Sequence, residues 1–539
     1  NAEVTKKDLY ETYLSAFHAC IKEAKPEAVM GAYNRVNGEP CCGSKTLLTD
    51  ILRNEWHFKG HVVSDCFALR DFYQHHMVTK DAVESAALAM NNGCDLNCGH
   101  MYLHLSEAVS RGMVSESRLR AAVTNLYTTR LKLGMEQDRE RPDNPYDKIP
   151  YSVVDSVEMR EFNESVSEKT FVLLKNNGIL PLNREKLRTI AVIGPNADSR
   201  RALVGNYEGT ASRYITISEG IQDYVGDSVR VLVSEGCDLY KENWKKNRIA
   251  EVREMAEMGD VVILCLGLDA GIEGEQGDAG NDFASGDKPD LKLPGEQNQI
   301  LEAALDSGKP VVVLLLSGSA LAVNTAQERA AAVMQCWYPG AQGGRAAARI
   351  LFGEVSPQGH LPVTFYKSTQ ELPEFTDYSM KNRTYRYMKQ EALYPFGYGL
   401  TYTSFAYDKM ECAADMHTFQ KMKAGEKIQL PVSVNVRNTG NFDCAETVQV
   451  YVKALCEDSL NPQLKGFGKV FLKAGEEKQV TVWLSEEAFG LYDENGRIYF
   501  TDEGYTVYIG GSQPDTRSLT LTGTIPLRQN LWSEVVNNT

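Results

Sequence analysis

The chain has 539 residues, a formal net charge of −15 and a pI near 5.3. This length predicts about two to four domains. The acidic balance, with no basic stripe on any predicted helix, argues against nucleic acid as a partner. The longest apolar run, at 310–316, is far short of the ~20 residues that span a bilayer, so we expect a soluble protein without a membrane partner.

The first block, residues 1–150, alternates helical periodicity with short apolar runs. We expect strands near 28–33, 61–65 and 94–97, and helices near 8–24, 47–56, 81–92, 101–111 and 115–134. This alternation predicts a parallel arrangement with short connections. A (β/α)8 barrel takes roughly 250 residues. We therefore interpret the block as the C-terminal half of such a barrel and a linker, the N-terminal half being removed or on a second chain. A self-sufficient α/β layer would leave a sheet edge uncovered.

One stretch of this block carries a candidate catalytic group. The segment Gly60–Cys66 has two valines followed by Asp65, at the point where a buried strand enters a loop. Parallel barrels place their chemistry at this carboxyl end of the strands, so Asp65 is a candidate nucleophile. An Asp that only caps the following helix gives the same local pattern.

The cysteines of the first block allow two interpretations. Cys94 and Cys98, with His100 nearby, have a spacing that metal sites use. No second cysteine or histidine pair completes a zinc site, so we predict no metal. Cys66, beside Asp65, is a candidate for a disulfide with a nearby cysteine of the barrel. Its oxidation state depends on the compartment, cytoplasmic or secreted, which the sequence leaves open.

The second block, residues 151–404, predicts a three-layer α/β domain. Nearly unbroken Val/Ile/Leu runs are typical of a parallel sheet that is covered on both faces. We expect its strands at 189–194, 229–233, 261–268, 311–316 and 331–336, and its helices near 248–258, 296–307 and 343–352.

A loop with several acidic residues leaves the third of these strands. It runs from Gly267 to Asp278 and contains Glu273 and Glu275 among small residues. Ligands approach an open α/β sheet at the carboxyl ends of its strands, so this loop is a candidate for a catalytic carboxylate. A solvated acidic loop without a catalytic role is the alternative interpretation.

The third block, residues 405–539, is predicted to be all β. Apolar residues alternate over 432–436, 448–452 and 480–484, and the pair Asn495-Gly496 predicts a tight hairpin. The pattern and the length fit a fibronectin type III-like sandwich of about 100 residues. We expect a structural role for this block, with carbohydrate binding as the alternative.

Signatures along almost the whole chain resemble, in the same order, those of glycoside hydrolase family 3. They are Val29–Asn34, Val36–Gly38, Lys59–Asp65, Leu173–Asn176, Ala191–Pro195, Gly205–Tyr207, Trp337–Gly340, Gly359–Thr364 and Tyr394–Thr403. Each motif is weak evidence alone, and together they are specific. The resemblance implies a retaining, exo-acting β-glycosidase that needs no cofactor and acts on β-linked oligosaccharides.

The resemblance also assigns roles to the candidate carboxylates. It implies that Asp65 forms the glycosyl–enzyme ester and that Glu275 is the acid/base, because the family's loop tends to place that Glu three residues before an Asp, here Asp278. Glu273 stays an alternative acid/base. The family usually has a basic residue directly after the Asp; this chain does not, and the later Lys288 is a second candidate for that position.

The substrate is less well defined. Cys66 follows the nucleophile where many β-glucosidases of the family carry Trp, and the neighbouring motifs look more like the β-xylosidase branch. Met30 and Tyr33 are expected beside the first sugar, with Tyr33 a candidate donor to Asp65. We predict a β-D-xylosidase. A β-D-glucosidase, a dual xylosidase/α-L-arabinosidase and a non-catalytic carbohydrate-binding protein are the alternatives, and a homo-oligomer is open.

Overall fold

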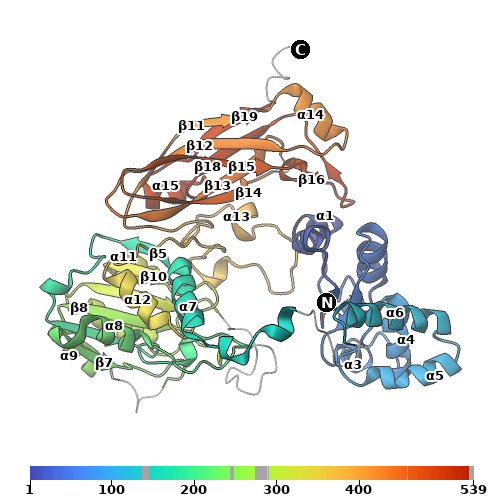
Figure 1. Ribbon diagram of the computed structural model, residues 1–539, viewed down its shortest axis with the longest axis horizontal. Helices are drawn as coiled ribbons and strands as arrows, with labels where there is room; N and C mark the ends of the chain where they lie inside the picture. The colour runs from blue at the N-terminus through green and yellow to red at the C-terminus, as the bar shows by residue number, and fades with distance from the viewer. Residues whose placement is uncertain (136–144, 243–247, 274–287, 289, 458, 533–539) are drawn as a thin grey trace. The chain divides into compact units, whose positions relative to one another are not determined.

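The computed structural model describes residues 1–135, 145–242, 248–273, 288, 290–457 and 459–532 (Figure 1). The chain forms two compact units. Unit 1 comprises Asn1–Ile149, Pro373–Lys381 and Leu491–Tyr499, and unit 2 comprises Pro150–Leu372, Asn382–Gly490 and Phe500–Thr539. Both the α/β block and the C-terminal β block lie mainly in unit 2, so the division into three domains at 1–150, 151–404 and 405–539 stays a prediction. Among the described residues, no helix is long and apolar enough to cross a membrane.

Unit 1 has a parallel strand pair surrounded by helices. The two strands are β1 (Ala28–Gly31) and β4 (His61–Ser64), with Val29 opposite Val62. This pairing confirms the parallel arrangement that we predicted for them. The other elements are α1 (Lys6–Asp8), η1 (Leu9–Tyr13), α2 (Ser15–Ala19), η2 (Cys20–Ala24), β2 (Arg35–Val36), β3 (Glu39–Pro40), η3 (Cys41–Gly43), η4 (Lys45–Glu55), α3 (Ala68–Gln74), α4 (Ala82–Asn92), η5 (Met101–His104), α5 (Leu105–Ser110), α6 (Glu116–Lys132), β16 (Leu491–Tyr492) and β17 (Ile498–Tyr499).

The third predicted strand, at 94–97, is reduced to one parallel bridge between Val63 and Leu96. The backbone N–H groups of Asp95 and Leu96 both donate to the carbonyl of Val62, at 2.8 and 3.0 Å. Two successive donors on one acceptor break the even spacing of a parallel ladder, so no regular strand forms there.

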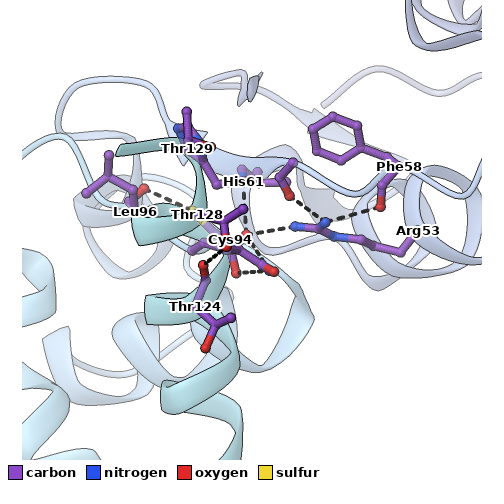
Figure 2. A network of polar contacts seen from close by, with 12 residues as sticks. Arg53, Phe58, His61, Cys94, Leu96, Thr124, Thr128 and Thr129 are labelled. Carbon is purple, nitrogen blue, oxygen red and sulfur yellow. Dashed lines mark hydrogen bonds and ion pairs between the residues drawn. The ribbon is translucent and has the colours of Figure 1, made fainter. Parts of the chain in front are cut away.

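A buried carboxylate ties three elements of unit 1 together. The side chain of Asp95 is fully buried and accepts hydrogen bonds from Arg53 at 2.7 Å, Arg118 at 3.0 Å and the N–H of Val62 at 3.0 Å. Figure 2 shows Arg53 extending on to the carbonyl of Phe58. The network joins η4, β4 and α6 at the N-terminal end of the strand. In a parallel barrel, residues at this end serve stability rather than chemistry.

We expect Asp95→Asn to lower the free energy of unfolding by about 3–5 kcal/mol, because the substitution leaves two mostly buried guanidinium groups without their carboxylate. Thermal unfolding followed by circular dichroism measures the change. Asp50→Asn is the matched control: Asp50 pairs with Lys45 and its side chain is 47% exposed, so its loss should cost less than about 1 kcal/mol. Equal effects of the two substitutions would contradict this account.

Unit 2 contains a six-stranded sheet in the order β5-β10-β9-β8-β6-β7. Its elements are α7 (Val157–Thr170), β5 (Val172–Asn176), β6 (Thr189–Ile193), α8 (Ile217–Val225), β7 (Arg230–Ser234), α9 (Ile249–Met258), β8 (Val261–Gly267), α10 (Gln297–Leu305), β9 (Val311–Leu316), α11 (Asn324–Arg329), β10 (Ala332–Gln335), α12 (Gly343–Leu351) and α13 (Thr384–Tyr387). The five strands that we predicted pair in parallel, as expected. A sixth strand that we did not predict, β5, pairs antiparallel with β10 at one edge. Strand β5 precedes the first βα unit, so no crossover helix fixes its direction.

The central strands of this sheet are buried on both faces. Alternate side chains pack against α9, α10 and α11 on one face, and against α8 and α12 on the other. All seven residues of β8 and all six of β9 are buried. This confirms the three-layer α/β arrangement and explains why these strands have nearly continuous apolar sequences.

The C-terminal part of unit 2 is a β-sandwich. Its sheets have the orders β11-β12-β15 and β14-β13-β18-β19, which confirms the predicted fold. The strands are β11 (Phe405–Cys412), β12 (Leu430–Asn438), β13 (Cys444–Ala454), β14 (Gln463–Leu472), β15 (Glu477–Leu484), β18 (Tyr505–Gly510) and β19 (Leu527–Leu531). Two short helices, α14 (Met416–Lys423) and α15 (Thr516–Thr522), lie between the strands of this all-β domain. Each begins after an Asp side chain, Asp415 or Asp515, that accepts a backbone N–H of its first turn.

The hairpin predicted at Asn495-Gly496 is present, but its strands β16 and β17 belong to unit 1. Gly496 has a φ of +75°, and a Cβ there would lie 2.6 Å from the ring of Tyr10. Glycine is needed at this turn because the backbone is left-handed and because a side chain would collide with Tyr10 of η1.

The sandwich buries an acidic side chain that has no cation directly bonded to it among the described residues. Glu446, on β13, is only 4% exposed, and the hydroxyl of Tyr407 donates to its Oε1. A Cβ at Gly511 would lie 2.4 Å from the same oxygen, so the backbone closes tightly over the carboxyl group. Burial raises the pKa of Glu446 to about 8.

This pKa makes the stability of the sandwich depend on pH. The folded state binds the proton more tightly than the unfolded chain, in which a Glu has a pKa of about 4.3. The stabilisation is therefore complete below that value and is lost as the pH rises through about 8. We expect Glu446→Gln to remove this part of the pH dependence in urea unfolding. Glu411→Gln, at an exposed position, is the control and should leave the pH dependence of the free energy of unfolding as in the wild type. The same pH dependence in Glu446→Gln would refute the raised pKa of Glu446.

Candidate active site

Asp65 lies where the chain leaves β4. Its N–H donates to the carbonyl of Gly31 at the end of β1, at 3.0 Å, and its Oδ1 accepts from the N–H of Cys66 at 2.7 Å. The following helix α3 has Phe67 as its N-cap residue, without a side-chain capping hydrogen bond, so Asp65 does not cap it. The carboxylate therefore lies at the carboxyl end of a parallel strand pair, the end at which parallel barrels place their active sites.

The turn that carries Asp65 is fixed by the neighbouring loop. Ser64 is 1% exposed, and its Oγ accepts from the N–H of Cys98 and from Nδ2 of Asn97, both at 3.0 Å. The N–H of Phe67 donates to the carbonyl of Cys98 at 2.8 Å. These contacts hold the segment that follows Leu96 beside the carboxyl end of β4.

Cys66 and Cys98 form a disulfide, with their Cα atoms 4.5 Å apart. The pairing is the one expected between Cys66 and a nearby barrel cysteine, and it occupies Cys98, one of the thiols considered for zinc. The other, Cys94, is buried with its Sγ 3.4 Å from the carbonyl of Leu96. The disulfide therefore crosslinks the two turns directly beside the candidate nucleophile.

Apolar side chains are exposed around this strand end. Met30 is 59% exposed and Tyr33 is 42% exposed. The hydroxyl of Tyr33 donates to the carbonyl of Cys66, the residue after Asp65, at 2.7 Å. A hydrogen bond from Tyr33 to the Asp65 carboxylate stays a prediction. Phe67, which the sequence did not point to, is 47% exposed and has a φ of +65°. An aromatic residue with a left-handed backbone conformation is uncommon, and such residues concentrate at functional sites. No sequence pattern reveals this conformation at Phe67.

In unit 2, the acidic loop is described as far as Glu273, and Glu275 lies outside the described residues. The segment after β8 is tightly built. The N–H of Leu268 donates to the carbonyl of Leu316 at 2.7 Å, and that of Glu273 donates to the carbonyl of Asp269 at 3.0 Å. Oδ1 of Asp269 accepts from the N–H of Gly271 at 2.7 Å. The described part of the loop, up to Glu273, is thus a hydrogen-bonded turn.

The carboxylate of Glu273 is bonded to the turn after β9. Its Oε2 accepts from the N–H of Gly318 and from the hydroxyl of Tyr338, both at 2.6 Å, and its Oε1 accepts from the hydroxyl of Ser319. Burial and then the Glu273 carboxylate raise the pKa of Tyr338 well above its ordinary value, so this phenol stays a donor.

Comparison with known proteins identifies the family. The "Glycosyl hydrolase family 3 C-terminal domain" matches residues 171–402, its N-terminal domain matches residues 1–129, and a "Fibronectin type III-like domain" matches residues 446–513. The chain belongs to glycoside hydrolase family 3. It is therefore a glycoside hydrolase, acting on β-linked glycosides.

Relatives of this family 3 enzyme include both xylosidases and glucosidases. The "Xylan 1,4-beta-xylosidase" of Xylanibacter ruminicola is 30% identical over 96% of this chain and 76% of its own length. "Beta-D-xylosidase 1" of Arabidopsis thaliana is 32% identical over 95% and 69%. Among solved structures, a β-glucosidase from Erythrobacter marinus has a TM-score of 0.85 at 30% identity, over 98% of this chain and 71% of that one. The "GH3 exo-beta-xylosidase (XlnD)" has a TM-score of 0.85 at 26% identity, over 98% and 69%.

Proposed function

We propose that this family 3 hydrolase is a retaining, exo-acting β-D-xylosidase that releases single sugars from the non-reducing end of β-linked oligosaccharides. The observation that supports it most is the position of Asp65 at the carboxyl end of β4, with its Oδ1 held by the N–H of Cys66. Relatives named as xylosidases, aligned over 95–96% of this chain, support the choice of substrate.

In the proposed mechanism, two carboxyl groups act on one glycosidic bond. Asp65 attacks the anomeric carbon and forms the glycosyl ester, while Glu275 protonates the departing oxygen. Glu275 then takes a proton from water, which hydrolyses the ester and retains the configuration. Retention requires the two carboxyl groups to lie about 5–5.5 Å apart when substrate is bound. Glu273 is the alternative acid/base.

The choice of sugar depends on the surroundings of Asp65. We propose that Met30, Tyr33 and Cys66 contact the first sugar, with the disulfide to Cys98 in place of a larger platform. Excluding one hydroxymethyl group from an apolar pocket contributes only about 1–3 kcal/mol. A β-D-glucosidase is therefore the second candidate. The "Periplasmic beta-glucosidase" of Salmonella typhimurium, 30% identical over 94% of this chain, favours it. A dual activity is suggested by the name of a Medicago relative, "Beta-xylosidase/alpha-L-arabinofuranosidase 2".

We also propose that the remaining units of the barrel, on the same or a second chain, cover an apolar stripe on α6. The stripe consists of Val123, Tyr127 and Leu131, which follow each other at intervals of four residues and are 46–55% exposed. Exposed apolar stripes of this kind mark an interaction surface. A second copy of this chain is the alternative cover. Activity assays should therefore use the chain both alone and joined to the additional barrel segment of a relative.

The catalytic roles predict distinct losses and rescues. Asp65→Ala should lower kcat by roughly 10⁵-fold or more, the range for removing a catalytic nucleophile, and azide should restore turnover with an inverted glycosyl azide as product. Glu275→Gln should lower kcat by about 10²–10⁴-fold on substrates that need acid assistance. Asp50→Ala, an exposed control on η4, should keep wild-type kcat. Full activity of Asp65→Ala would exclude the proposed mechanism.

The substrate assignment predicts a ranking of activities. The value of kcat/KM on a nitrophenyl β-xyloside should exceed that on the β-glucoside, by a factor within the roughly 10–200-fold that one hydroxymethyl group allows. An α-arabinoside tests the dual activity in the same assay. A preference for the β-glucoside would replace the first candidate with the second, and binding of xylo-oligosaccharides without turnover would favour a binding protein.

A further inference from the structure

We propose that Glu273 is a positioning residue, not the proton donor: its carboxylate anchors the chain that leaves β8 to the turn Gly318–Ala320. The proposal rests on the proposed role of Glu275, which follows two residues later. This positioning role explains how the enzyme can use only Glu275 as the acid although Glu273 lies two residues before it in the sequence.

The groups that bond to the Glu273 carboxylate within the described part of the chain all belong to its own unit. The N–H of Gly318 can only donate, and the hydroxyls of Ser319 and Tyr338 complete a set of three donors on two oxygens. An acid/base residue must present a proton to the leaving oxygen of the substrate. Glu273 would have to give up these three partners to do so, and the loss of each hydrogen bond costs stability.

The turn is shaped to receive this carboxylate. A Cβ at Gly318 would lie 3.1 Å from Oε2 of Glu273 and 3.1 Å from Cε2 of Tyr338. A side chain there would crowd both groups. Glycine at this position therefore lets the backbone N–H approach the carboxylate closely.

A second anchor comes from the far side of the loop. The ammonium group of Lys288 donates to the carbonyl of Ala320, in the same turn, and interacts electrostatically with Glu273. Burial lowers the pKa of Lys288, and the negative charge of Glu273 counteracts that effect. The described residues on both sides of 274–287 are thus bonded to one turn.

The distance to the proposed acid makes such an anchor effective. Glu275 follows Glu273 by two residues in the sequence, and two residues of chain span at most about 7 Å. A misplacement of about 1 Å in a catalytic group can cost about 10²-fold in rate. Anchoring the first turn of the loop thus contributes to the rate without any contact between Glu273 and the substrate.

The test compares variants of the anchor with variants of the acid. Glu273→Gln, Ser319→Ala and Tyr338→Phe should each lower kcat/KM on xylobiose by about 10–100-fold. The kcat/KM on a dinitrophenyl xyloside should change little, because its leaving group needs no acid in the first step. The basic limb of the pH–rate profile should persist in all three, and azide should not accelerate them. In Glu275→Gln the basic limb should disappear, and azide should give a glycosyl azide of retained configuration. Glu254→Gln, an exposed charge loss on α9, is the matched control.

Two results would overturn the proposal: loss of the basic limb with azide rescue in Glu273→Gln, or anchor variants indistinguishable from Glu254→Gln. Hydrogen exchange provides a readout that does not need turnover. Amides of 268–273 and 317–320 should exchange faster in Ser319→Ala and Tyr338→Phe at unchanged melting temperature. An enzyme inactive on every glycoside would refute the proposed function, whereas unchanged exchange in these variants would refute the anchor. Ser319→Ala and Tyr338→Phe each remove a single hydroxyl group, so these two variants test the anchor even if Glu273→Gln does not fold.

Discussion

The register between β8 and β9 is the constraint on which the loop architecture of unit 2 depends. Gly267 lies opposite Leu316, the last residue of β9. A Cβ at Gly267 would lie 2.0 Å from the carbonyl oxygen of Leu316, so only glycine lets the two strands remain paired to their ends. Because both strands end at one level, the turns that follow leave the sheet side by side. Glu273 can therefore reach Gly318 across this edge.

Parallel strands that end at the same level also position the candidate nucleophile in unit 1. Strands β1 and β4 run parallel and end together, at Gly31 and Ser64. Asp65 follows directly and bonds back to Gly31. In both units, a carboxylate that is a candidate for function or positioning follows a buried parallel strand, and short polar contacts hold the turn behind it. Rigid strands place these groups more precisely than loops alone can.

The buried acids away from these strand ends serve the scaffold. Asp95 remains paired because two arginines and a backbone N–H face it. Glu446 accepts from a tyrosine hydroxyl and packs against the backbone of Gly511, and no cation is bonded directly to it among the residues that the structure describes. Burial without a direct cation favours the protonated acid, whereas a cationic pair favours the carboxylate. Sequence position does not distinguish these two cases, since both residues lie in or beside apolar segments.

The sequence by itself determined the parallel α/β core, the β-sandwich and the position of Asp65. These follow from local patterns, because doubly covered strands must be continuously apolar and half-covered strands must alternate. Only the tertiary structure decided the antiparallel direction of β5, the reduction of the strand at 94–97 to one bridge, and the partners of Glu273. Each of these depends on which groups, distant in the chain, compete for the same hydrogen-bonding atoms, and a linear pattern carries no record of that competition.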